Sequence, residues 1–306
     1  MIKLKRVLCP VDFSAVSNRA LHYAIQLARD HDARLQMLHV IRPLDPSLYV
    51  DITRVEATMK KRVDREMPKL VKAAQTAGVE AESAVWSGVI ESEIQRAARQ
   101  QKADVIVMGK HSRSRVERWL IGSTTDRLLR QSTVPLLIIG ESKAKPSSPP
   151  NLLRIVVTTD LSEGTETALA YAILLGQDAN ANVLFLHVVP APVIAITPSA
   201  GFMPVEPQPS TEQARQELEK RIPADARNKC VVETRVEFGE PYLEILNVVK
   251  EIRADLLVMN IHGKGSVERA LLGSTAERVI RGAACPVLAI PPRKKAQRNL
   301  SRRRER

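Results

Sequence analysis

The stretch GKHSRSRVERWLIGSTTDRLL, residues 109–129, recurs later in the chain as NIHGKGSVERALLGSTAERVI, residues 260–280. Both copies carry a histidine, a Val-Glu-Arg run and a Gly-Ser-Thr run at the same spacing. Each copy also lacks one small residue that the other keeps, and the two losses fall at different positions. The chain therefore contains one loop twice, altered differently each time.

The repeat extends to both sides of this loop. RVLCPVDFS (6–14) matches RIVVTTDLS (154–162), and the tripeptide LHV occurs at 38–40 and again at 186–188. A repeat of this length indicates tandem domains rather than a solenoid of short units. We expect a first domain at residues 1–140, a linker at 141–151, a second domain at 152–291 and a basic, disordered tail at 292–306.

Each copy alternates short Val- and Leu-rich runs with segments whose apolar residues recur at helical spacing. Fully apolar strands that alternate with helices are typical of a parallel sheet covered on both faces. The expected fold class is therefore α/β, with two tandem doubly wound domains, each a five-stranded parallel sheet. In the first copy we expect strands at 4–11, 33–41, 80–86, 103–108 and 135–139, helices near 20–28, 52–77 and 90–101, and a helix from 122.

Net charge and composition restrict the function classes. The formal net charge is +12, and the stretch 293–306 supplies more than half of it, with eight Lys and Arg residues and one Glu. Because the basicity is concentrated in a terminal run and aromatic residues make up only 3% of the chain, the pattern disfavours specific nucleic-acid binding. Such a run can still bind RNA or acidic lipid by electrostatics.

Other classes are disfavoured by what the chain lacks. No apolar run is long enough to span a bilayer, and the N-terminus does not resemble a signal peptide, so we expect a cytoplasmic protein. The three cysteines are far apart, which argues against a disulfide framework or a zinc site. The chain contains neither a P-loop nor a complete dinucleotide-binding fingerprint. A segment with six prolines, residues 190–210, is expected to be a loop placed where it could act as a lid.

Two features point to a binding site. Asp12 and Asp160 end the first strand of each copy, and the repeated loops leave the fourth strands. If the first and fourth strands are neighbours, these features meet at the carboxyl edge of the sheet, where open α/β sheets bind ligands. The Gly-Ser-Thr runs stand where helices begin, and a helix N-terminus there would suit a phosphate. The alternative is an ordinary Ser or Thr helix cap.

At this point the chain resembles a tandem universal stress protein, with one family domain at about 3–140 and another at about 152–290. Nucleotide-binding members carry the motif G-x2-G-x9-G-[ST], and both copies keep its spacing. The resemblance implies an adenine-nucleotide alpha-hydrolase-like fold that binds ATP or a related adenine nucleotide, with or without Mg²⁺. It also implies the binding residues, namely Asp12, Val40, Gly109, Ser112, Gly122, Ser123 and Thr124 in the first copy and Asp160, Val188, Asn260, Gly263, Gly273, Ser274 and Thr275 in the second.

Each copy departs from this motif once. Ser112 replaces a glycine on the phosphate side of the first copy, and Asn260 replaces a glycine on the ribose side of the second. One interpretation is that the two halves diverged into unequal nucleotide sites. The other is that neither half binds nucleotide and only the architecture persists. The histidines repeated in the second strands, His39 and His187, are interpreted as structural because they lie in apolar runs.

The leading hypothesis is a cytoplasmic regulator of the stress response that binds an adenine nucleotide and turns over little or none of it. No set of catalytic residues is identified. The alternatives are a nucleotide-free interaction scaffold with an electrostatic tail, and a slow ATP hydrolase. The resemblance further implies that the halves pack as an internal pseudo-dimer through the last strands, VPLLII (134–139) and CPVLAI (285–290). A homodimer and an unknown protein partner stay open.

Overall fold

The structure is a computed structural model. It describes residues 2–43, 52–110, 121–140, 152–162, 164–190, 194–197, 201–204, 211–261 and 272–292. The expected linker at 141–151 and the tail from residue 293 lie outside the described residues.

The first half follows the expected alternation, and its elements begin and end within a few residues of the expected positions. They are β1 (Arg6–Pro10), α1 (Ala15–Asp30), β2 (Arg34–Ile41), α2 (Ile52–Thr76), β3 (Ala81–Ser87), α3 (Ile90–Gln100), β4 (Val105–Gly109), α4 (Ser123–Gln131) and β5 (Leu136–Ile139).

The second half repeats this order, with a much shorter second helix. Its elements are β6 (Arg154–Thr159), α5 (Thr165–Gly176), β7 (Asn182–Pro190), α6 (Thr211–Lys220), β10 (Val231–Gly239), α7 (Pro241–Glu251), β11 (Leu256–Asn260), α8 (Ser274–Gly282) and β12 (Val287–Ile290). Short 3₁₀ turns lie at Gln177–Ala179 and Ala226–Asn228.

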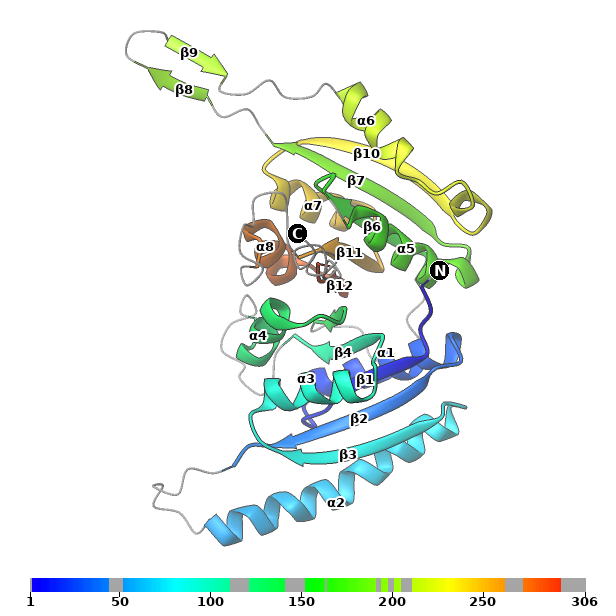
Figure 1. The fold of residues 1–306 in the computed structure, drawn as a ribbon, viewed down its shortest axis with the longest axis vertical. Helices are drawn as coiled ribbons and strands as arrows, with labels where there is room; N and C mark the ends of the chain where they lie inside the picture. The colour runs from blue at the N-terminus through cyan, green and yellow to red at the C-terminus, as the bar shows by residue number, and fades with distance from the viewer. Residues whose placement is uncertain are drawn as a thin grey trace, which may run out of the picture.

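The strands form a single ten-stranded sheet in the order β10-β7-β6-β11-β12-β5-β4-β1-β2-β3 (Figure 1). Within this sheet all pairs inside each half are parallel, which confirms the expected fold class. The first and fourth strands of each half are neighbours, β1 beside β4 and β6 beside β11. The last strands, β5 and β12, pair antiparallel and join the halves, with Leu137 opposite Leu288.

Helices cover both faces of the sheet, and the side chains of each strand alternate between them. In β5, Leu137 and Ile139 belong to the cluster under α1, α2, α5 and α6, whereas Leu136 and Ile138 belong to the cluster under α3, α4, α7 and α8. Both clusters continue across the junction of the halves. Because each fully buried Leu or Ile contributes about 1.5–3 kcal/mol, the junction is part of the hydrophobic core.

An aspartate at the start of the fourth strand ties it to the first strand in both halves. The Asp104 carboxylate accepts hydrogen bonds from the backbone N–H groups of Lys5 and Arg6, at 2.7 and 2.9 Å. Asp255 does the same for the N–H of Arg154, at 2.9 Å, and also accepts from its guanidinium. These contacts fix the neighbouring strands whose opposite ends form the candidate site.

The 190–210 segment contains regular structure that its proline content did not predict. Strands β8 (Ile194–Thr197) and β9 (Gly201–Pro204) form an antiparallel pair. Figure 1 shows this hairpin projecting away from the ten-stranded sheet.

Candidate functional site

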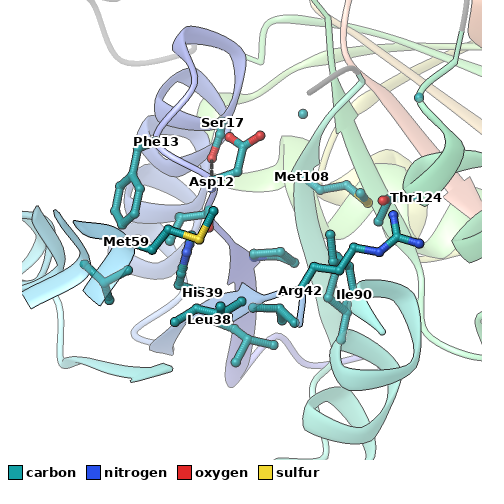
Figure 2. A pocket seen from close by; sticks show the side chains of 18 of the residues that line it. Asp12, Phe13, Ser17, Leu38, His39, Arg42, Met59, Ile90, Met108 and Thr124 are labelled. Atoms are coloured by element: carbon teal, nitrogen blue, oxygen red, sulfur yellow. Dashed lines mark hydrogen bonds between the residues drawn. The ribbon is translucent and has the colours of Figure 1, made fainter. Parts of the chain in front are cut away.

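A pocket of about 520 Å³ opens at the carboxyl ends of β1, β2 and β4 in the first half. Its walls come from these strand ends, from α2 and α3, and from the start of α4 (Figure 2). Pockets of this size are typical of small-molecule sites. The lining includes six residues predicted from the sequence, namely Asp12, Val40, Gly109, Gly122, Ser123 and Thr124.

The Asp12 carboxylate is held by a tight local turn directly after β1. Its Oδ1 accepts a hydrogen bond from the N–H of Ser14 at 2.9 Å, and its own N–H donates to Ser17 Oγ at 3.1 Å. Phe13 between them has a positive φ of 62°, which directs the chain from the strand into α1. The second half repeats the turn, since Asp160 Oδ1 accepts from the N–H of Ser162 at 3.0 Å.

The first turn of α4 faces the pocket with a glycine as its N-cap. Gly122 occupies the N-cap position, and no side chain caps the helix. Ser123 and Thr124 are therefore the first two helical residues, and the alternative of a Ser or Thr cap is wrong. The first N–H groups of a helix have no intrahelical partner and carry partial positive charge, so this turn presents donors to the pocket. In α8 the N-cap is likewise Gly273.

Thr125 fixes the start of α4 to the end of β4. Its buried hydroxyl donates to the carbonyl oxygens of Gly109 and Lys110, at 3.2 and 3.3 Å. The N–H of Gly122 also donates to the Lys110 carbonyl, at 3.0 Å. The helix N-terminus is thus held against the strand that leads into the repeated loop.

The exchange of Gly109 for Asn260 is explained by packing against the first helix. A Cβ on Gly109 would lie 2.8 Å from Val16 Cγ1, so the valine on α1 leaves no room for a side chain. In the second half the residue at the position of Val16 is Gly164, whose own Cβ would lie 3.6 Å from Asn260 Nδ2. The side chain has therefore moved from the helix to the strand. Asn260 Nδ2 is buried and makes no hydrogen bond among the described residues.

The repeated histidines are structural, as the sequence predicted. His39 Nδ1 lies 2.7 Å from the carbonyl oxygen of Val11, and His187 Nδ1 lies 2.8 Å from that of Thr159. Because a carbonyl only accepts, Nδ1 carries the proton in both rings. The His39 ring also stacks on Phe13, with ring centroids 4.7 Å apart, and so forms part of the pocket wall.

These two halves match a known family. The model of the universal stress protein family matches residues 3–140 and again residues 152–291. The chain belongs to the universal stress protein family.

Some relatives match nearly the whole chain, and others match about half of it. A universal stress protein of Mycolicibacterium smegmatis is 25% identical over 299 residues, covering 94% of this chain and 97% of the relative. One from Methanocaldococcus jannaschii is 33% identical over 142 residues, covering 46% of this chain and 84% of the relative. The crystal structure of a universal stress protein from Archaeoglobus fulgidus superposes with a TM-score of 0.73 at 24% identity, covering 96% of this chain and 99% of that one.

The second half places its own family-motif residues at equivalent positions. Asp160 follows β6, Val188 lies in β7 and Asn260 ends β11. Ser274 and Thr275 begin α8 after Gly273. Ser112 and Gly263, with the loop histidines His111 and His262, lie outside the described residues.

Several pocket residues were missed by the sequence analysis. Arg42 follows β2, Met59 and Arg62 lie on α2, and Ile90 and Ile94 lie on α3. Met59 and Arg62 belong to no repeated motif, because α2 has 25 residues and its counterpart α6 has 10. Arg42 corresponds to Pro190, whereas Ile94 recurs as Ile245 and is part of the apolar pattern of its helix. The only signal was the amphipathic pattern of α2, which does not show that the helix borders a pocket.

A buried lysine links this site to the second half. Lys110 is 6% exposed, and its ammonium donates a hydrogen bond to the carbonyl oxygen of Arg281 near the end of α8. Burial and, to a smaller extent, the charge of Arg281 lower the pKa of Lys110 to about 8. The corresponding residue of the second half is the apolar Ile261, so the link is made from one side only.

No helix among the described residues is long and apolar enough to cross a membrane. Those residues also contain no group of three or more His, Cys, Asp or Glu side chains that could hold a metal ion.

Proposed function

We propose that the first half binds ATP or a related adenine nucleotide and that the protein acts as a regulator of the stress response with little or no turnover. The observation that carries this proposal is that Asp12, Val40 and the start of α4 line one and the same pocket. Family members commonly bind adenine nucleotides. Because the Gly-Ser-Thr segment resembles the family motif, we place the phosphates of the nucleotide at the start of α4.

The distribution of polarity in the pocket suits a nucleotide. Leu38, Ile94 and Met108 supply apolar surface for a base. Asp12 offers a carboxylate that can accept hydrogen bonds from ribose hydroxyl groups, and the first turn of α4 offers N–H donors to phosphate oxygens. Figure 2 shows Asp12 and Thr124 on different sides of the pocket, so a nucleotide could lie across it with its phosphates toward α4.

Magnesium is proposed only as part of a nucleotide complex. Asp12 is the one carboxylate among the described residues that line the pocket. Mg²⁺ commonly keeps several waters and binds through one or two carboxylates together with substrate phosphates. This donor set therefore fits an ion delivered by the nucleotide rather than a site built by the protein.

The two halves are proposed to be unequal sites. In the second half Asn260 occupies the position of Gly109, and Gly164 makes the room for it. This exchange preserves the packing of helix on strand, but it places an amide beside Gly164 at the end of β11, where the first half has only backbone on the strand. The second half therefore differs on the ribose side and the first half, through Ser112, on the phosphate side.

The first experiment is to purify the protein under non-denaturing conditions, denature it and identify released nucleotide by mass spectrometry, followed by titration with ATP. We expect about one adenine nucleotide per chain, lost in Asp12→Ala and kept in Asp160→Ala. Asp32→Asn is the matched control, because this exposed carboxylate precedes β2 at the opposite edge of the sheet.

Other results would select the alternatives. About two nucleotides per chain would mean that both departures from the motif are tolerated. No release and no binding of added ATP would contradict the proposal and leave the interaction scaffold. Steady release of phosphate that Asp12→Ala abolishes would favour the slow hydrolase. The cytoplasmic location, the homodimer and the protein partner stay predictions from the sequence.

A further inference from the structure

Arg42 is a cationic residue of the pocket that neither the repeat nor the family motif contains. It follows β2 directly and is exposed. Figure 2 shows its side chain extending along the pocket beside Ile90, with the guanidinium directed toward Thr124 at the start of α4. The corresponding residue of the second half, two positions after Val188, is Pro190. The first half alone therefore has this charge.

The guanidinium of Arg42 is not held by a carboxylate among the residues that the structure describes. Glu91 on α3 is affected by the charge of Arg42, but it forms its ion pair with Arg127. Burial raises the pKa of Glu91, but its hydrogen bonds and the charges of Arg127 and Arg42 outweigh burial and lower it. Arg42 thus acts on Glu91 only at a distance, whereas Arg127 makes the direct contact.

The other arginine of the pocket is arranged differently. Arg62 on α2 lies over the Phe13 ring, 5.4 Å from its centroid, and Figure 2 shows Phe13 on the side of the pocket away from Thr124. Its cation is therefore partnered by an aromatic face and lies away from the start of α4. Of the two arginines among the described lining residues, Arg42 is the one that joins the N–H donors of α4 in facing the proposed position of the phosphates.

We propose that Arg42 is a specificity-determining residue that binds the outer phosphates of the ligand, so that the first half selects a nucleoside di- or triphosphate over a monophosphate or a nucleoside. This inference rests on the proposed function. The physical reason is that a guanidinium offers paired N–H donors and a permanent charge to phosphate oxygens. A single phosphate at the first turn of α4 would use the helix donors, and further phosphates would extend from there toward Arg42.

The test is calorimetric titration of the full-length protein with ATP, ADP, AMP and adenosine, carried out on an Asp160→Ala background so that the first half supplies the signal. We expect ATP and ADP to bind more tightly than AMP and adenosine. Arg42→Gln should weaken ATP binding about tenfold, because a charge-assisted contact at an exposed site is lost, and change adenosine binding less than about twofold. Arg42→Lys should recover part of the ATP affinity. Arg34→Gln, at the opposite end of the same strand, is the matched control for charge and should leave all four affinities unchanged.

The outcomes separate this inference from the proposed function. Equal loss of ATP and adenosine binding in Arg42→Gln, or unchanged ATP binding, would overturn the role of Arg42 and leave the nucleotide site standing. The role of Arg42 would also be overturned if the Asp160→Ala protein, with Arg42 unchanged, bound adenosine as tightly as ATP. If none of the four ligands binds, the proposed function fails and this inference fails with it.

Discussion

At the scale of the residue, the two halves exchange a side chain between strand and helix. Gly109 faces Val16 in the first half, and Asn260 faces Gly164 in the second. By comparison with the family motif, Asn260 is a departure from a glycine. The packing shows that Gly164 on the facing segment makes room for its side chain. Each position is constrained by the residue opposite it, so single substitutions should be costly and paired ones tolerated.

Gly109→Ala should destabilise the protein by about 1–3 kcal/mol, because its new methyl group would lie 2.8 Å from Val16 Cγ1. The double variant Gly109→Ala with Val16→Ala should recover part of this loss, which urea denaturation of the four proteins of the cycle would measure. Gly140→Ala is the control, since a Cβ there meets nothing within 4 Å. Strictly additive effects would contradict the packing explanation.

Lys110 should make stability depend on pH. Its pKa of about 8 in the folded protein lies below the roughly 10.4 of an unfolded lysine, so the unfolded chain binds more protons between these values. The stabilisation that Lys110 contributes is therefore fully present above about pH 10.4 and is lost as the pH falls through 8. Relative to Lys110→Met, the wild type should gain up to about 3 kcal/mol between pH 8 and 10.5. Urea denaturation of both proteins across this pH range would measure this gain. Any contribution of the cysteines is common to both proteins and cancels when their free energies of unfolding are subtracted. A difference that does not change with pH would show that the lysine is not desolvated.

At the scale of the element, the start of α4 depends on one hydroxyl group. Thr125 Oγ1 donates to carbonyl oxygens at the end of β4, and the corresponding residue of α8 is Ala276. Thr125→Val keeps the shape and removes the donor, which should cost about 1 kcal/mol. Hydrogen exchange should accelerate at the amides of Gly122 and Asp126, whose N–H groups are hydrogen-bonded at the start of α4, and stay unchanged in α8. Equal protection of α4 in both proteins would mean that the Gly122 backbone contact suffices.

Element order and the position of the two aspartates after the first strands could be predicted because they follow from local periodicity and from a repeat. The adjacency of the first and fourth strands was left open by the sequence and is shown by the structure. The walls supplied by α2 could not be predicted. Arg42, Met59 and Arg62 occur in segments that the second half does not match, and their position in the pocket depends on how a long helix packs across the strand ends. Hairpin β8–β9 was missed because proline-rich sequence obscures a short strand pair. The alternative of a Ser or Thr cap stayed open because a sequence does not show which residue of Gly-Ser-Thr is the N-cap, and the structure shows that it is Gly122.

At the scale of the whole molecule, the pairing of β5 with β12 makes one sheet and two continuous cores from the two halves. An ion pair crosses the same junction, since Arg130 contacts Glu277 at 3.8 Å. The chain should therefore unfold as one cooperative unit although it contains two copies of a domain that exists alone in relatives. The protein carries its own probes of each half, because Cys9 and Cys230 are both buried.

Cooperative unfolding predicts that a ligand of one half protects the other. In the Asp160→Ala protein, ATP at a hundred times its Kd should add about 2.7 kcal/mol to the free energy of unfolding. Pulsed thiol labelling in increasing urea, read by peptide mass spectrometry, should then show Cys9 and Cys230 exposed at one shared midpoint, and ATP should move both midpoints upward together. A shift at Cys9 alone would mean that the halves unfold independently and that the β5–β12 junction transmits no stability between them. Adenosine at the same multiple of its own Kd is the control, since equal saturation should give an equal shift whatever the phosphate contacts.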